Sequence, residues 1–380
     1  MDFTLTKEQV LIQQLAREFA ENEVKPIAAE IDEEERYPEE TIPKMFKAGF
    51  FQCPHPRSIG GAGGDYVAYS ICMEEIAKVC ASTAVTLSVH SSLGINLMAK
   101  YGTPAQKEKY MERLMNSELA CFCLTEAGAG SDSSAQKTRA TKVDGGWVIN
   151  GTKMFITYAG HAGLYYVIAV TDKTKGTKGI TCFIVEKDNP GLKIGKHEKK
   201  CGIRGSATCE VVLENCFVAD DAVLGKVGEG LKVALGGLDQ GRIGIASQAL
   251  GIAQGALDEA MKYVRERKQF GKRLSQFQKT QFSIADMQTR VDAARLLVRR
   301  AANYKDIGHP QAGMAASMAK LFASDTANIV TRECVQLLGG YGYTREYPVE
   351  RMFRDAKITE IYEGTSEVQR IVISRALNIK

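Results

Sequence analysis

A glutamate near the C-terminus is the first candidate for catalysis. Glu363 lies in the segment 361–365 (IYEGT), directly before Ser366 and Gln369, which have the spacing of a capping box for a last helix. If its two apolar neighbours exclude water, its pKa rises and it becomes a base able to take a proton from carbon next to a carbonyl. A solvated carboxylate favoured by the helix dipole explains the same residue equally well.

A glycine-rich loop is a second candidate. Residues 123–132 read CLTEAGAGSD, and their free backbone N–H groups suit a phosphate or the polar edge of a flavin. The loop falls at a junction between two parts of the chain, where ligands often bind. Taken alone, the pattern is more often an ordinary connection.

Two more segments suit an anionic ligand. Five cations surround Gln269-Phe270-Gly271, and such a cluster matches a pyrophosphate, although a solvated basic helix end has the same composition. In residues 335–343 (VQLLGGYGY), paired glycines either end a helix or admit a ligand close to the backbone. The five cations are Arg265, Arg267, Lys268, Lys272 and Arg273.

Neither histidine nor cysteine spacing indicates a metal site. The ten cysteines are scattered, without a Cys-x-x-Cys pair, which is typical of reduced thiols in the cytoplasm. We therefore expect no metal and assign the histidines no catalytic role. The five histidines are His55, His90, His161, His197 and His309.

The elements that must position these residues fall into three regions. Residues 1–120 show helical periodicity, which begins at a capping box of Thr6 and Gln9. Residues 121–225 are rich in short β segments, and residues 226–380 return to helix. The sequence predicts an α+β, mainly α fold with an N-terminal helical domain, a central antiparallel β barrel and a C-terminal four-helix bundle.

The central strands and the bundle are predicted from their patterns. Turns separate the β segments without intervening helices, so a Rossmann fold is disfavoured. The expected strands are 147–150, 154–157, 164–171, 179–186 and 209–218. The expected bundle seam is Ile284, Met287, Val291, Ala294, Val298 and Ala301.

Composition excludes several classes of protein. The formal net charge of +4 is small for 380 residues, and the basic residues are interspersed with acids, so we expect no nucleic-acid partner. The longest apolar run, Leu164–Val170, is too short to span a membrane, and we expect a cytoplasmic protein.

Small residues crowd segment 236–246, which allows a neighbour or a ligand to approach closely.

Together these segments resemble the acyl-CoA dehydrogenase family along essentially the whole chain, especially its short-chain and butyryl-CoA members. Several motifs occur in the family's order, and chance agreement of the whole set is implausible. The matching motifs are residues 124–126 with 128–132, 238–239 with 241–244, Arg267 with 269–271, Gln336 with 339–342, and 354–357 with 361–365.

The resemblance implies one FAD in each subunit of a homotetramer and assigns site residues by position. Glu363 is the implied catalytic base, and the implied contacts to acyl-CoA are Ser131, Asp239, Arg242 and Gly364. The implied FAD contacts within the subunit are Phe122, Leu124, Thr125, Gly130, Ser131, Phe155, Ile156, Thr157, Thr365 and Glu367. The implied contacts to a neighbouring subunit's FAD are Arg267, Phe270, Gln278, Gln336, Gly339 and Gly340.

The resemblance also implies the reaction, which is α,β-dehydrogenation of a short-chain acyl-CoA to trans-2-enoyl-CoA, with electrons passed to electron-transferring flavoprotein. Phe155 stands where many relatives have Trp and resembles bacterial enzymes, so the reverse reaction is an alternative. It would reduce a crotonyl-, acrylyl- or aryl-enoyl-CoA such as caffeyl-CoA in an anaerobe. One form of this alternative places the reductase in an electron-bifurcating complex. A desulfinating lyase or a redox-silent CoA-binding module is the remaining alternative, disfavoured because Glu363 is present.

Overall fold

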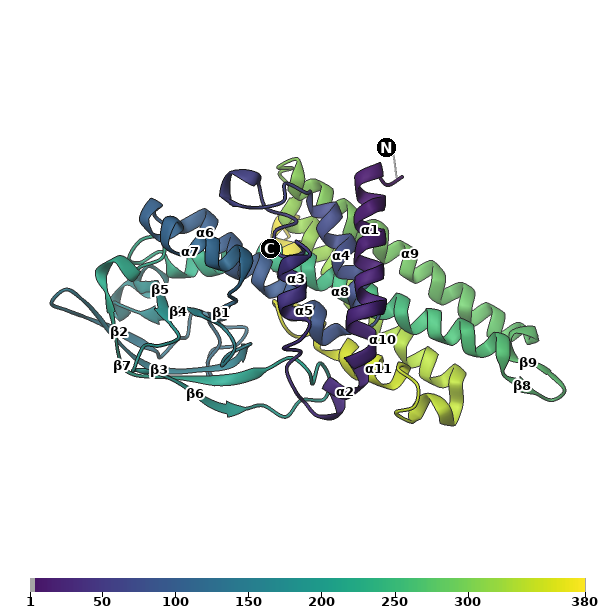
Figure 1. The fold of residues 1–380 in the computed structure, drawn as a ribbon. Helices are drawn as coiled ribbons and strands as arrows, with labels where there is room; N and C mark the ends of the chain where they lie inside the picture. Colours follow the sequence, from purple (N-terminus) through teal and green to yellow (C-terminus); the bar gives the residue numbers. More distant parts are fainter. Residues whose placement is uncertain (1–3, 380) are drawn as a thin grey trace.

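The computed structural model describes residues 4–379, and its elements follow the three predicted regions. Helices come first, a β-rich region lies at one end of the molecule, and long helices extend to the other end (Figure 1). The first region contains α1 (Lys7–Phe19), α2 (Ala28–Glu33), α3 (Ile42–Lys47), α4 (Tyr66–Ala77), α5 (Ala81–Val89), α6 (Asn96–Tyr101) and α7 (Pro104–Asn116).

Local sequence signals explain where several of these helices begin. The predicted capping box of Thr6 and Gln9 is confirmed at the start of α1, with both reciprocal hydrogen bonds present. Thr103 and Gln106 form a second capping box at α7, where Pro104 occupies the first helical position. The predicted helical character of this region is therefore confirmed.

A single curled sheet forms the central region, and it is a half-barrel rather than a closed cylinder. All five expected β segments are present, the first two joined as β3, but three further strands, β1, β2 and β6, were not predicted. The sheet also differs from a purely antiparallel one, because β1 and β2 both pair with β4 in parallel. Its strands are β1 (Ala120–Cys123), β2 (Arg139–Val143), β3 (Gly146–Thr157), β4 (Leu164–Val170), β5 (Ile180–Glu186), β6 (Leu192–His197) and β7 (Thr208–Ala219).

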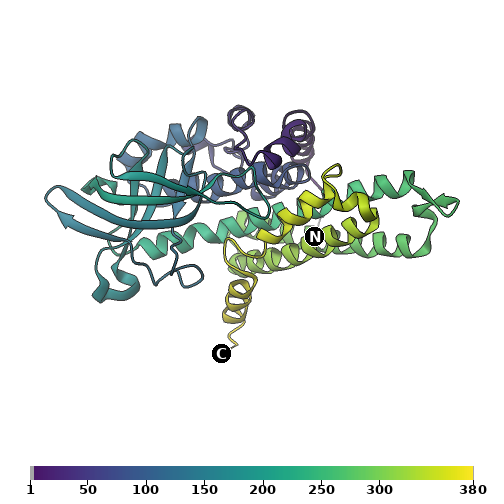
Figure 2. The same ribbon diagram turned by 90° about the horizontal axis from the view of Figure 1, so that it is seen from below.

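Long helices make up the C-terminal region, and α8 runs the length of the molecule from the sheet to a hairpin at the far end (Figure 2). The predicted seam is confirmed: every member is buried except Ile284, which is partly buried. The elements are α8 (Gly230–Glu266), the hairpin β8 (Lys268–Gln269) and β9 (Lys272–Arg273), α9 (Gln278–Asp306), α10 (Ala312–Leu338), α11 (Val349–Ile358) and α12 (Ser366–Ala376).

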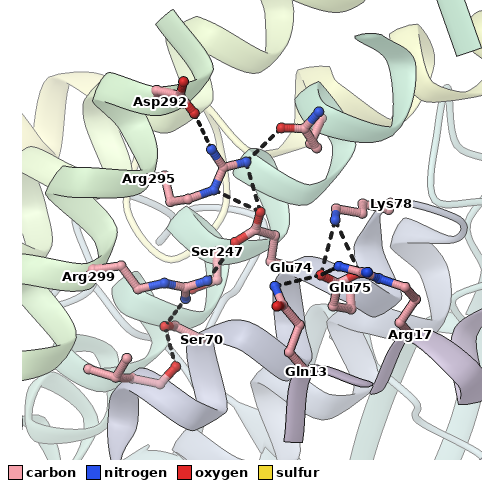
Figure 3. Close-up of polar contacts among 12 residues, drawn as sticks. Gln13, Arg17, Ser70, Glu74, Glu75, Lys78, Ser247, Asp292, Arg295 and Arg299 are labelled. Carbon is pink, nitrogen blue, oxygen red and sulfur yellow. Dashed lines mark hydrogen bonds and ion pairs between the residues drawn. The ribbon is translucent and has the colours of Figure 1, made fainter. Parts of the chain in front are cut away.

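An ion-pair cluster joins the N-terminal helices to the bundle (Figure 3). Glu74 of α4 is buried, and its two carboxylate oxygens accept hydrogen bonds from Arg295 (3.0 Å) and Arg299 (2.6 Å) of α9. The adjacent Glu75 pairs with Arg17 of α1 and with Lys78, both at 3.1 Å. The cluster thus ties α1, α4 and α9 together beside α8.

Candidate active site

Glu363 lies in the tight turn between α11 and α12. It adopts the left-handed conformation (φ 54°), and so does Gly364 (φ 91°). For a residue other than glycine this backbone is strained and is often associated with function. The predicted capping box of Ser366 and Gln369 is wrong, because the N-cap is Thr365, whose hydroxyl accepts a hydrogen bond from the N–H of Val368.

The side chain of Gln369 is used to hold the turn instead. Its amide donates to the backbone carbonyl of Glu363 (3.2 Å) and to that of Gly364 (2.8 Å). Both carbonyls of the strained turn are therefore anchored by a single buried residue of α12.

The carboxylate of Glu363 packs against the glycine-rich part of α8. A Cβ atom on Gly241 would lie 2.3 Å from Glu363 Oε2, so only glycine leaves room for the carboxylate there. Three residues further along, a Cβ on Gly244 would meet Ser88 Oγ at 2.2 Å. The close approach predicted for segment 236–246 is thus made partly by the candidate base itself.

The surroundings of Glu363 favour its protonated form more than water does. Its Oε2 is buried and accepts no hydrogen bond from the described residues. Burial raises the pKa of Glu363 to about 7, and the positive charges of Arg242 and Lys320 oppose that rise. A carboxyl group with such a pKa can act as a general base near neutral pH.

The residues expected to contact substrate lie partly around this carboxylate. Arg242 is buried next to Gly241, and its guanidinium donates to Asp239 (2.7 Å) and Ser317 (3.5 Å). Gly364 follows the base directly, whereas Ser131 is exposed in the glycine-rich loop. The structure therefore groups Asp239, Arg242 and Gly364 with Glu363.

Two predicted flavin-lining segments lie side by side. The N–H of Met154 in β3 donates to the carbonyl of Thr125 (2.8 Å), which joins the glycine-rich loop to the strand that carries Phe155. Leu124 and Ile156 are buried, and Phe122 and Thr157 are half-buried. The pairing of β3 with β7 shifts register between Lys153 and Ile156, and at this bulge Phe155 has φ 58° and is exposed.

A second group of predicted flavin residues lies far from Glu363. Arg267 is the C-cap of α8, 26 residues after Gly241, which corresponds to about 39 Å along the helix. Its guanidinium stacks over the ring of Tyr341, 5.3 Å from the centroid, and so joins the basic cluster to the paired-glycine segment. Phe270 is exposed at the hairpin tip, and Gly339 ends α10 with φ 61°. The last turn of α10 contains Gln336, and Gly340 follows shortly after that helix, while α9 begins at Gln278.

The remaining two predicted flavin residues begin the last helix. Thr365 caps α12, and Glu367 is exposed in its first turn. Both therefore follow the Glu363 turn directly.

Sequence reasoning missed two buried lysines at this site. Lys153 is fully buried and donates to Glu126 (2.7 Å) and to the carbonyl of Leu124 (3.2 Å), so it fastens the glycine-rich loop to β3. Lys320 is fully buried in α10 and donates to the carbonyl of Gly364 (2.8 Å). The only local signal for Lys320 is a charge among small residues, three positions after Ser317.

The fold and the buried carboxylate define a protein with a candidate general base, and comparison with known proteins identifies its family as one of oxidoreductases. The chain belongs to the acyl-CoA dehydrogenase family, whose members are flavoproteins that act on the CH–CH group of acyl-CoA. The models of its N-terminal, middle and C-terminal domains match residues 6–118, 121–216 and 228–378.

Individual relatives match over nearly their whole length. The chain is 53% identical to the short-chain specific acyl-CoA dehydrogenase of Clostridium acetobutylicum, covering 98% of this chain and 99% of the relative. It is 48% identical to the acryloyl-CoA reductase (NADH) of Anaerotignum propionicum, covering 99% and 95%. The solved structure of butyryl-CoA dehydrogenase from Megasphaera elsdenii matches with a TM-score of 0.97 at 46% identity, covering both chains completely.

Proposed function

We propose that this protein is an FAD-dependent dehydrogenase of short-chain acyl-CoA thioesters, with Glu363 as its catalytic base. The observation that carries the proposal is the Glu363 carboxylate, which lies against Gly241, has a pKa of about 7 and has a buried oxygen with no hydrogen-bond partner in the described part of the chain. Such a base matches the removal of an α-proton from a thioester at neutral pH.

The surrounding groups support the chemistry in complementary ways. Glu363 takes the α-proton, while its own backbone N–H, which donates to no group within residues 4–379, polarises the thioester carbonyl. Arg242, Asp239, Gly364 and Ser131 hold the acyl-CoA. When bound, FAD would supply the acceptor for the hydride that leaves the β-carbon.

The residues of the candidate FAD site fit a flavin, because the glycine-rich loop leaves its backbone open to a ligand. Space is free within 4 Å of where a Cβ would stand on Gly128 or Gly130, so a ligand can approach this backbone. The within-subunit contacts would come from this loop, the β3 bulge at Phe155 and the start of α12, at Thr365 and Glu367.

A homotetramer supplies the rest of the FAD site. The group around Arg267 and Phe270 is too far from Glu363 to serve the same site, so it would reach the FAD of a neighbouring subunit. Phe270 is 92% exposed, and α12 stands away from the body of the chain (Figure 2). Such projecting apolar groups are typical of subunit contacts.

Relatives support both the substrate class and a second direction. The Clostridium relative supports a short acyl chain, and the acryloyl-CoA reductase supports physiological reduction of an enoyl-CoA by the same residues. We further propose electron-transferring flavoprotein as the redox partner, on the basis of family membership, and a cytoplasmic location. No helix within residues 4–379 has the length and apolarity required to cross a bilayer.

The same comparisons support the domain boundaries that the sequence predicted. We propose three domains, residues 1–120, 121–225 and 226–380. The family models and the change from helix to strand and back are consistent with these limits.

The direct test replaces Glu363 with Gln and mixes FAD-loaded protein with butyryl-CoA without oxygen. We expect the flavin absorption to bleach at least about a thousandfold more slowly than in wild type, because the base is lost while the shape of the turn is kept. Glu108→Gln, an exposed change in α7, is the matched control and should bleach normally. Normal bleaching by the FAD-loaded Glu363→Gln variant would show that Glu363 is not the base.

A further inference from the structure

Lys320 is a buried charge that the proposed chemistry leaves without a role. Its side chain is fully buried in α10, and it forms no salt bridge with any described residue. Its ammonium group instead donates to the carbonyl of Gly364 at 2.8 Å. Burying an unpaired ammonium is costly, so a specific benefit must retain it there.

The contact falls on the most constrained part of the site. Glu363 and Gly364 are consecutive left-handed residues, and this conformation is strained for a residue other than glycine. Gln369 holds both carbonyls from one side, and Lys320 holds the second carbonyl from α10. The carboxylate itself packs closely on Gly241, so a shift of the turn towards α8 would bring it against the helix backbone.

Lys320 also belongs to the electrostatic surroundings of Glu363. The charged groups that act on Glu363 are Arg242 on α8 and Lys320 on α10. The charge of Glu363 in turn raises the pKa of the hydroxyls that face it, which belong to Tyr69 on α4, Tyr158 after β3 and the adjacent Tyr362. Burial lowers the pKa of Lys320 to about 8, and the negative charges of Glu363, Glu360 and Asp325 oppose this change, whereas Arg242 adds to it. The charges of Glu363 and Lys320 therefore stabilise each other.

We propose that Lys320 is a positioning residue with two actions on Glu363. Through the carbonyl of Gly364 it holds the turn in its left-handed shape, and through its charge it keeps the Glu363 carboxylate ionised. The effect of Lys320 on catalysis rests on the proposed function of Glu363 as the base. The effect of Lys320 on the ionisation of Glu363 is independent of that proposal.

Two substitutions separate these actions. Lys320→Met removes both the donor and the charge at similar length, whereas Lys320→Gln removes the charge and keeps a donor. Lys357→Met is the matched control, because Lys357 is an exposed lysine of α11 that pairs with Glu360 beside the same turn. Melting temperature and FAD content establish that each variant is folded.

The decisive readout is the protonation of Glu363 itself. Its carboxyl band is isolated as the infrared difference between each protein and the same protein carrying Glu363→Gln, and it is titrated with pH. We expect the midpoint to rise by about one unit in both Lys320 variants and to stay unchanged in Lys357→Met. At high pH, where Glu363 is ionised in every variant, kcat should recover in Lys320→Gln but stay at least about tenfold low in Lys320→Met.

The two proposals fail in different ways. An unchanged midpoint in folded Lys320→Gln overturns the role of Lys320, even if Lys320→Met does not fold. Full bleaching by Glu363→Gln would overturn the proposed base, while a shifted infrared midpoint would still establish that Lys320 governs the ionisation of Glu363.

Discussion

The carboxylate of Glu363 is a stronger base than a solvated carboxylate because it is buried and its neighbours offer it little hydrogen bonding. Gly241 contributes only backbone, and the buried Oε2 has no hydrogen-bond partner among residues 4–379. Arg242 and Lys320 supply positive charge to it from a distance, while Arg242 pairs with Asp239 and Lys320 donates to the carbonyl of Gly364. The group is therefore desolvated enough to be basic and still ionised near neutrality.

The reaction rate should follow the ionisation of Glu363. Because the carboxylate is the active form and its pKa is about 7, flavin bleaching by butyryl-CoA should slow tenfold per unit as pH falls below about 7 and should level off above it. Stopped-flow absorbance across this pH range measures the profile. A flat profile through pH 7 would contradict the raised pKa.

Protein stability gives an independent check of the same shift. Folding raises the pKa of Glu363 from 4.5 to about 7, so the native state binds more protons between these values and loses stability as pH rises through them. Glu363→Gln should therefore raise the melting temperature above about pH 7 and give no such gain below about pH 4.5.

Among the helices, the cluster of Glu74 and Glu75 fixes how the N-terminal region meets the bundle. Glu74 is the shared acceptor of two arginines of α9, and Arg299 also donates to Ser70 on α4. Since α4 also carries Tyr69, which is close enough to Glu363 to respond to its charge, the cluster supports one wall of the site.

Removing the acceptor should destabilise this junction. Glu74→Ala leaves the largely buried guanidinium of Arg299 without its carboxylate partner and leaves Arg295 paired with Asp292 alone, which should cost about 3–5 kcal/mol of folding free energy. Chemical denaturation followed by circular dichroism measures the loss. Glu21→Gln, which breaks an exposed pair with Lys25, is the control and should change stability very little. Equal effects of the two changes would contradict the structural role of Glu74.

Elements with strong periodicity or clear caps were predictable, and those defined by distant partners were not. The seam from Met287 to Ala301 was predicted from spacing, whereas β6 has an exposed, lysine-rich sequence and exists because it pairs with β7. Ser366 and Gln369 match a capping box, but Gln369 turns back to the Glu363 turn. The burial of Glu363 depends on α8 and α10, both far away in sequence, so the local motif identified the residue and not its surroundings.

At the scale of the whole molecule, the chain carries parts of two binding surfaces, one around Glu363 and one around Arg267. Glu363 packs on Gly241, in the part of α8 that is nearer the sheet, and the glycine-rich loop leads into the sheet. Arg267 and Phe270 belong to the end of α8 and the β8–β9 hairpin, which Figure 1 shows at the far end of the molecule. This separation supports an assembly in which each subunit completes the site of another.

A charge at the hairpin tip should disrupt this assembly. Phe270→Asp replaces a 92% exposed aromatic ring with a carboxylate that must be desolvated in a subunit contact. We expect smaller species in sedimentation velocity and weaker FAD retention, measured by flavin fluorescence. Val227→Asp, a change at a 55% exposed residue near the sheet, should leave both properties unchanged. An intact tetramer of Phe270→Asp with bound FAD would exclude the hairpin from the contact.

The uninterrupted α8 helix fixes both the distance and the relative orientation of the two surfaces. It has 37 residues, with Gly241 about a third of the way along it and its C-cap Arg267 at the far end. One inserted residue between them would turn the hairpin by about 100° and move it about 1.5 Å relative to Glu363. Substitutions in this stretch change single contacts, whereas a change of length misdirects every residue beyond it. The number of residues in α8 is therefore constrained more strictly than the identity of most of them.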